Sequence, residues 1–194
     1  MVARQFIDPC QPRRCGGAQK RGPANEPSDH ALGRSRGGFG TKLQLLVDGN
    51  GLPLSALLLP GAAHESTQFE ALVETVQVKR PGRRARRRPR RIGADRAYHA
   101  QRIRHWLRMH GIGSVIPPRR QRGKRRRGRP LSYDRVRYRN RNVIERSVGW
   151  LKECRALATR FEKLAVHYLG LVQLAIIERY LRILTRTPID VATT

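Results

Sequence analysis

Apolar and polar residues along the chain fall into short segments that predict strands and helices in turn. The segments 42–48 (KLQLLVD) and 53–59 (PLSALLL) are apolar runs on either side of Asp48-Gly-Asn-Gly. An Asp-Gly pair between two apolar runs is a strong hairpin signal, because glycine adopts the backbone conformation that such turns require. We therefore predict two antiparallel strands here and assign Asp48 to the turn that joins them.

Further along, apolar positions recur with the period of an α-helix, and short apolar runs between them indicate strands. Helices are expected at 66–78, with Ser66 as the N-cap, and at 99–110, 136–157 and 163–186. Additional short strands are expected at 92–95, 114–117 and 3–8. The most apolar segment, 164–184, is interrupted by charged residues, so it is interpreted as a buried helix and not as a membrane span.

This order of elements predicts an α/β fold with a mixed sheet flanked by helices, because short strands alternate with helices. Three parts are expected along the chain. Residues 1–38 would hold a truncated first strand and a flexible basic segment, residues 39–187 the main domain with two helices at its end, and residues 188–194 a tail.

The charge of the chain points to a polyanionic partner. Its 194 residues carry 41 Lys and Arg against 14 Asp and Glu, a formal net charge of +27. A charge of this size favours nucleic acid, and the sequence offers no signal peptide or spanning segment that would favour a membrane. Two runs concentrate the charge: residues 83–91 hold seven arginines in nine positions, and residues 119–129 hold eight basic side chains in eleven. These runs are either plain solvated loops or a sequence-independent grip on phosphates.

In so basic a chain, an acid at the carboxyl end of a strand is a candidate ligand or catalytic group. Asp8, Asp48 and Asp95 occupy such positions, and the hairpin turn already accounts for Asp48. Asp95 lies between a strand and a helix, where open α/β sheets bind ligands. The alternative for Asp95 is a helix cap.

Glu145 is best judged on a helical wheel. At about 100° per residue, Tyr138, Arg141, Glu145 and Lys152 share a wedge of roughly 60°. The apolar positions of the same segment face the other way. By periodicity alone, such a polar stripe is either a solvated face held by pairs such as Arg141 and Glu145, or a functional surface.

The spacing of these four residues resembles the helix motif of DDE-type bacterial insertion-sequence transposases of the YREK group. Further likeness to that family lies in five other segments: GRSRGGFGTK (33–42), GAAHESTQ (61–68), ADRAY (94–98), RNVIER (141–146) and ATRFEKL (158–164). The resemblance covers about residues 31–186, and it implies a ribonuclease H-like catalytic domain.

The resemblance also implies chemistry. Asp95 and Glu145 match the family's second and third catalytic acids, and Asp8 is the candidate for the first, so these three would hold Mg²⁺, with Mn²⁺ as a substitute. The site would cleave transposon ends and transfer the freed strands into target DNA. DNA contacts would come from the helix motif and from the two basic runs, which gives Tyr138, Arg141, Lys152, Arg86, Arg87, Arg88, Arg125, Arg126 and Arg127.

The amino end departs from the family pattern, in which a helical DNA-binding region precedes the first acid. Asp8 follows only seven residues and is followed by Pro9, which cannot donate a backbone hydrogen bond. The chain is therefore expected to be the product of a downstream reading frame, or an inactive remnant that binds DNA without specificity. A homodimer on DNA, a product of an upstream frame as a second partner, and a location in the bacterial cytoplasm at the nucleoid are expected. Charge alone leaves an RNA-binding protein as a further alternative.

Overall fold

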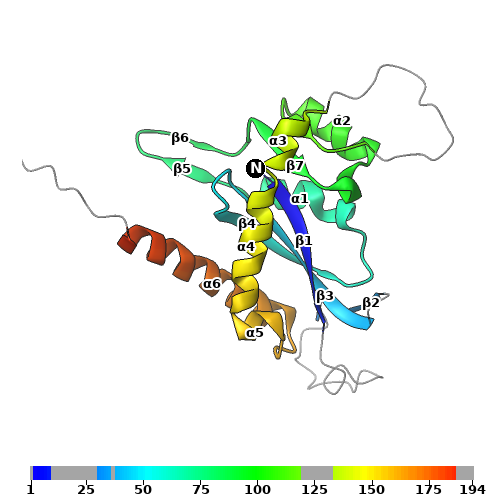
Figure 1. Ribbon diagram of the computed structural model, residues 1–194, viewed down its shortest axis with the longest axis vertical. Helices are drawn as coiled ribbons and strands as arrows, with labels where there is room; N and C mark the ends of the chain where they lie inside the picture. The colour runs from blue at the N-terminus through cyan, green and yellow to red at the C-terminus, as the bar shows by residue number, and fades with distance from the viewer. Residues whose placement is uncertain (1, 10–29, 36–37, 119–132, 187–194) are drawn as a thin grey trace, which may run out of the picture.

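The computed structural model describes residues 2–9, 30–35, 38–118 and 133–186. These residues form a mixed sheet covered by helices on both faces (Figure 1), which confirms the predicted α/β class. The second basic run, with Arg125, Arg126 and Arg127, lies outside the described residues, as does the predicted tail.

The sheet contains six strands, in the order β2-β3-β1-β7-β8, with β4 paired to β3. Their bounds are β1 Val2–Pro9, β2 Gly33–Ser35, β3 Gly38–Val47, β4 Pro53–Pro60, β7 Arg91–Ala94 and β8 Gly113–Val115. Strand β1 is antiparallel to β3 and parallel to β7, and β7 is parallel to β8. Strands β1 and β2 of this sheet both lie within residues 1–38, where a truncated first strand and a flexible basic segment were expected.

Strand β3 explains how the two faces of the sheet are filled. Its side chains alternate, so Leu43, Leu45 and Val47 join one buried cluster while Leu46 joins the other. Both faces are covered, and this is why the sequence reads as a nearly continuous apolar run. The hairpin to β4 is confirmed: Asp48 Oδ1 accepts the backbone N–H groups of Asn50 and Leu52, each at 2.8 Å.

On one face lie three short helices and one longer one. They are η1 (Glu65–Gln68), α1 (Phe69–Glu74), η2 (Arg96–Tyr98) and α2 (Gln101–Met109). The predicted cap at Ser66 is wrong, because the side chain of His64 accepts the Ser66 N–H and Ser66 itself lies inside η1. Helix α2 ends before Gly111, whose φ of 66° lets the chain turn into β8, as the sequence indicated.

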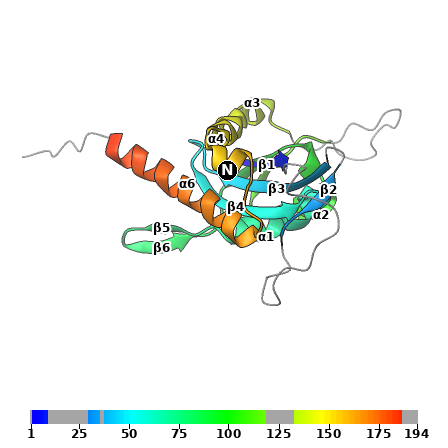
Figure 2. The ribbon, with the colours of Figure 1, turned by 90° about the horizontal axis from the view of Figure 1, so that it is seen from below.

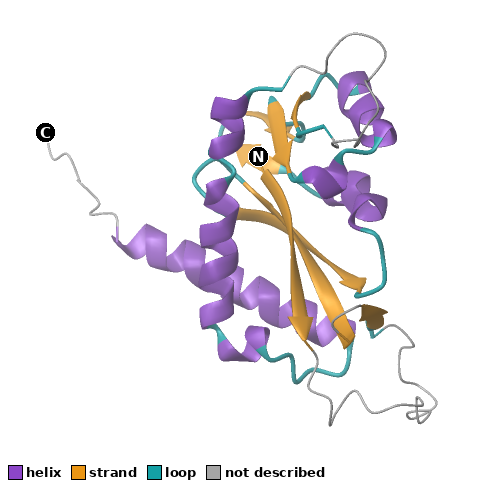
Figure 3. Cartoon of the chain, turned by 45° about the vertical axis from the view of Figure 1, so that its right-hand side comes forward, coloured by secondary structure: helices purple, strands orange, loops and turns teal. Residues whose placement is uncertain are grey.

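The opposite face carries α3 (Arg135–Arg139), α4 (Asn142–Glu153), α5 (Arg155–Ala158) and α6 (Ala165–Arg186) (Figure 3). The single helix predicted for 136–157 is therefore wrong. Around Asn140 and Arg141 the backbone bonds span three residues instead of four, which tightens the helix, and Cys154 has an extended backbone that ends α4.

Helix α6 differs from the predicted buried helix. Tyr168, Val172 and Ala175 pack against the sheet, but a second set of large apolar side chains is exposed. The cause is a second apolar stripe on the helix, which the sheet does not reach. Within the described residues, no helix is long and apolar enough to cross a membrane.

One two-stranded hairpin was not predicted from the sequence. Strands β5 (Val78–Arg80) and β6 (Arg83–Arg86) form a separate two-stranded hairpin from the first part of the arginine run. Figure 2 shows this hairpin and the carboxyl end of α6 extending beyond the body on the same side. Residues 83–86 of the arginine run thus form a strand, where a solvated loop was one of the two predictions.

Candidate active site

Asp95 follows directly on β7, at the carboxyl end of a strand in the middle of the sheet. Its Oδ1 accepts the backbone N–H of Ala97 at 2.9 Å, so it also caps the short helix η2. The two predictions for Asp95, helix cap and strand-end carboxylate, are thus compatible, because a carboxylate has a second oxygen for other ligands.

Tyr98 fixes the position of the turn that holds Asp95. Its ring is buried against Phe69, with ring centroids 5.4 Å apart, and its hydroxyl accepts a hydrogen bond from Gln44 Nε2 at 3.1 Å. Burial, followed by the negative charges of Glu65 and Asp95, raises the pKa of Tyr98 well above its usual value. The hydroxyl therefore stays protonated, and η2 is fastened to β3 through a neutral buried contact.

Glu145 lies in the first turn of α4 and is half-buried. Arg141, the N-cap residue of that helix, places Nη2 3.8 Å from Glu145 Oε1. The same guanidinium lies 5.2 Å from the centre of the Tyr138 ring. Arg141 therefore contacts both of its neighbours in the predicted motif, although the helix tightens between Tyr138 and Glu145. A partly exposed pair of this kind adds at most about 1 kcal/mol of stability.

Lys152 completes the motif in the last turn of α4. It lies seven residues after Glu145, so the two positions differ by only about 20° around the helix and by roughly 10 Å along it. Its side chain is exposed. The predicted polar face therefore runs along α4, while Ile144, Val148 and Leu151 on the other side enter the core.

The hydroxyl of Tyr133 is influenced by charged groups next to Asp95 and at the start of α4. Partial burial and the neighbouring Tyr138 raise the pKa of Tyr133, whereas the positive charges of Arg135, Arg96 and Arg141 lower it. Arg96 is adjacent to Asp95, and Arg141 contacts Glu145. Arg96 and Arg141 thus both contribute positive charge near the Tyr133 hydroxyl. Tyr133 was not among the predicted site residues, because its spacing offers no signal.

Asp8 lies at a different level of the sheet. In the register of the parallel pair, Ala3 lies opposite Ala94, so Asp95 is level with Arg4. Asp8 is four residues further along β1, or about 13 Å at 3.3 Å per residue. On the other side its backbone pairs with Thr41, near the far end of β3. In this register the backbone of Asp8 is not level with that of Asp95, and the triad of Asp8, Asp95 and Glu145 stays a prediction.

The donor set has the right chemistry for a hard divalent cation. Asp95 and Glu145 offer carboxylate oxygens, which Mg²⁺ prefers, and Mg²⁺ commonly takes one or two protein carboxylates and fills its other positions with water and phosphate. No group of three or more His, Cys, Asp or Glu side chains suited to a metal ion occurs among the residues described.

With this arrangement of strand-end and helix carboxylates in place, the comparisons with known proteins decide the family. A family model described as "Transposase DDE domain" matches residues 13–177. The chain belongs to this transposase family. It is also 34% identical over 151 residues to a Burkholderia cepacia protein named "Putative transposase for insertion sequence element IS402".

That match covers 77% of this chain and 63% of the relative, so the chain spans less than two thirds of the length of the transposase that it resembles. No solved structure is significantly similar to it. The family assignment confirms the resemblance that the helix motif indicated.

Proposed function

We propose that this chain is the catalytic domain of a DNA transposase, with Asp95 and Glu145 as metal-binding carboxylates. The observation that carries the proposal is their placement in a DDE transposase domain, one at the carboxyl end of β7 and one on α4 beside Arg141. The strand order, with an antiparallel β3-β1 pair followed by parallel β7 and β8, supports a ribonuclease H-like fold.

In this proposal Asp95 and Glu145 hold Mg²⁺ or Mn²⁺ through their carboxylate oxygens. A bound divalent ion would activate the attacking oxygen and stabilise the leaving oxygen in a displacement at phosphorus. The cap from Ala97 N–H and the buried Tyr98 restrict how Asp95 can turn, so its carboxylate is positioned before DNA arrives. The substrates would be transposon ends and then target DNA.

The other motif residues would bind the strand next to the scissile phosphate. Arg141 presents a planar guanidinium that can hold a phosphate through two parallel hydrogen bonds, and Lys152 adds a point charge further along α4. Tyr138, already in contact with Arg141, offers a ring on which a base can stack. This row would direct a strand along α4.

The experiment that tests the proposal is strand cleavage of labelled duplex carrying the element's terminal repeats. Cleavage is expected in Mg²⁺ or Mn²⁺ and none in EDTA. It should be measured with the chain alone and with a product of an upstream frame, because the longer relative supplies parts that have no counterpart in the match. Absence of cleavage in both mixtures, with DNA binding intact, would leave a DNA-binding remnant and contradict the enzyme.

We also propose a homodimer on DNA, formed through the exposed apolar stripe of α6. Leu174, Ile177, Leu181 and Leu184 are each more than half exposed and recur at alternating intervals of three and four residues, the spacing of helices that pair. A second copy fits this stripe because it carries the same pattern. Glu178 pairs with Arg182 in a salt bridge beside the stripe, which offsets one of the positive charges there.

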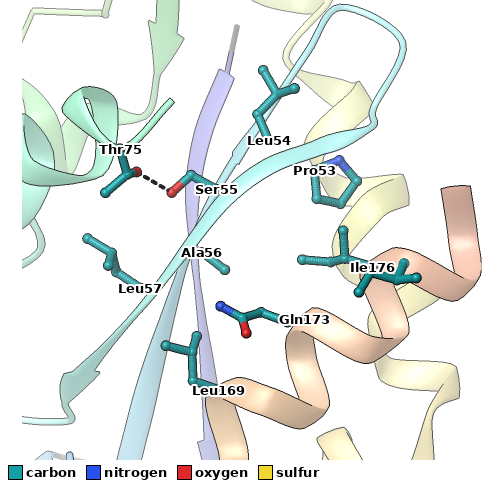
Figure 4. Close-up of a pocket in the computed structure, with 10 residues that line it drawn as sticks. Pro53, Leu54, Ser55, Ala56, Leu57, Thr75, Leu169, Gln173 and Ile176 are labelled. Carbon is teal, nitrogen blue, oxygen red and sulfur yellow. Dashed lines mark hydrogen bonds between the residues drawn. The ribbon is translucent and has the colours of Figure 1, made fainter. Parts of the chain in front are cut away.

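A pocket beside the stripe enlarges this surface. It lies between β4 and α6, and Figure 4 shows Leu54, Leu57, Leu169 and Ile176 around it. Ile177 belongs to both the pocket and the stripe. The apolar area available to a second copy is therefore wider than one helix edge, as stable self-association requires.

Replacing Ile177 and Leu181 together by Gln is expected to convert the dimer to a monomer. Both side chains are already exposed, so the fold should persist. Sedimentation equilibrium in high salt would measure the mass, with Met109, an exposed apolar residue of α2, replaced by Gln as the control. A wild-type chain that sediments as a monomer at all concentrations, with or without DNA, would contradict the dimer.

A further inference from the structure

The β5–β6 hairpin is the most strongly charged regular element that the structure describes. Every residue of β5 is exposed, and so are Arg83, Arg84 and Arg86 of β6. Between Glu74 and Asp95 the chain contains nine basic residues and no acidic residue. No carboxylate within the segment therefore relieves the repulsion among these cations.

The pairing within the hairpin brings like charges together. Arg80 lies directly opposite Arg83, on either side of the tight turn at Pro81 and Gly82. Like charges in opposite positions destabilise an antiparallel pair, and an isolated two-stranded hairpin is marginal in water. The hairpin therefore requires counter-charge, and closely spaced phosphates would supply it.

The charge lies on both faces of the ribbon. Arg83 and Arg84 are consecutive residues of β6, so their side chains point to opposite faces. Both are exposed, and neither face is covered by another element, in agreement with the way the hairpin projects in Figures 1 and 2. A ribbon that docks flat on a DNA backbone needs charge on one face only. Charge on both faces fits a space that has phosphates on either side.

We propose that the β5–β6 hairpin inserts into the major groove of duplex DNA, so that the arginines on its two faces reach the phosphates of both groove walls. The major groove, about 12 Å wide and 8.5 Å deep, admits a two-stranded ribbon. A strand of four residues is about 13 Å long, which matches that groove. This inference rests on the proposed function for the choice of DNA, and it adds a groove contact distant from the carboxylates.

The contact is sequence-tolerant for the most part, because phosphates carry no base identity. Arginine at the tip can also hydrogen-bond the O6 and N7 atoms of guanine, so a modest preference for G·C steps follows. The hairpin would grip the duplex away from the cut, while α4 holds the scissile strand.

The test measures DNA binding by fluorescence anisotropy in EDTA, so that it does not depend on cleavage. Replacing Arg80, Arg83 and Arg84 together by Gln is expected to weaken binding at least about tenfold and to lower the slope of log affinity against log salt by about 2 to 3. The matched control replaces three exposed arginines elsewhere, Arg34, Arg108 and Arg155, by Gln. The control should lose much less affinity than the hairpin variant.

A second variant separates shape from charge. Gly82 has a φ of +64°, and a Cβ added there meets nothing within 4 Å, so Gly82→Val strains only the turn and keeps every cation. It is expected to weaken binding severalfold. Unmodified duplex should also bind more tightly than duplex whose major groove is filled by glucosylated hydroxymethylcytosine.

Two results would overturn the inference: equal losses in the hairpin and control triples, which would mean that net charge alone acts, or equal binding to the two duplexes. Either result can occur whether or not the chain cleaves DNA. Conversely, a chain that does not cleave DNA but shows the hairpin effects would contradict the proposed cleavage activity and support the groove contact.

Discussion

Changing Asp95 to Asn or Glu145 to Gln should lower metal-dependent strand cleavage at least about a hundredfold, because each change removes a carboxylate ligand. The fold should be unaffected. Asn caps helices as well as Asp does, so the bond to the Ala97 N–H persists, and Glu145 is half-buried at the start of α4, where an amide fits without a new cavity.

Cleavage rates and DNA affinity should be measured on the same preparations, since loss of a metal ligand lowers the first and spares the second. Asp48→Asn is the matched control, because Asp48 also ends a strand and is engaged in a turn. Cleavage at the wild-type rate by Asp95→Asn or Glu145→Gln would exclude that residue from the proposed site. A loss in Asp48→Asn equal to theirs would exclude both.

The same assay should separate Asp8 from the other two acids. Its register places it about 13 Å beyond Asp95 along β1. Asp8→Asn is therefore expected to change cleavage less than twofold. The comparison is made in whichever of the two mixtures, the chain alone or the chain with an upstream product, cleaves DNA. A loss as large as that of Asp95→Asn would show that β1 shifts its register when DNA or metal binds.

Local signals predicted those parts of the fold and site that depend on neighbours in sequence. The Asp48 turn, the strand end before Asp95 and the end of α2 at Gly111 each follow from a few adjacent residues. The polar face of α4 also follows, because Glu145 and Lys152 lie two turns apart on one regular helix.

Other features depend on contacts between distant segments, and the sequence could not predict them. A strand at 3–8 was expected, but its register against β7 depends on the whole sheet, and that register sets the level of the Asp8 backbone relative to that of Asp95. The helix tightens around Asn140, where backbone hydrogen bonds span three residues, although no proline or glycine in the sequence indicates a change there. Arginine-rich strands run against β-propensity, so β5 and β6 had no local signal.

Arg160, within the ATRFEKL segment, is another residue whose part in the fold appears only in three dimensions. It is 4% exposed, and its guanidinium donates to Thr41 Oγ1 and to the backbone carbonyl of His30. Its Nε donates to the Glu162 carbonyl at 3.1 Å, and its charge lies 4.9 Å from the centre of the Tyr168 ring. One buried side chain thus joins β3, the segment before β2, and the turn into α6.

Arg160→Met is therefore expected to lower the free energy of unfolding by about 3 kcal/mol or more. Met fills much of the volume but leaves the carbonyls of His30, Glu162 and Lys163 and the Thr41 hydroxyl without this buried donor, at a cost of about 1 to 3 kcal/mol each where water cannot reach them. Arg160→Lys should recover only part of the loss, because a single ammonium cannot reproduce a planar group that donates in several directions.

Urea unfolding followed by circular dichroism would give these values, with Arg155→Met, an exposed arginine of α5, as the matched control. A loss below about 1 kcal/mol for Arg160→Met would mean that water replaces the guanidinium in its pocket. A large loss would show that Arg160 stabilises the corner where β1 and β3 pair. Thr41, to which Arg160 donates, is the backbone partner of Asp8 in β1, so the corner that Arg160 stabilises also fixes that end of the sheet.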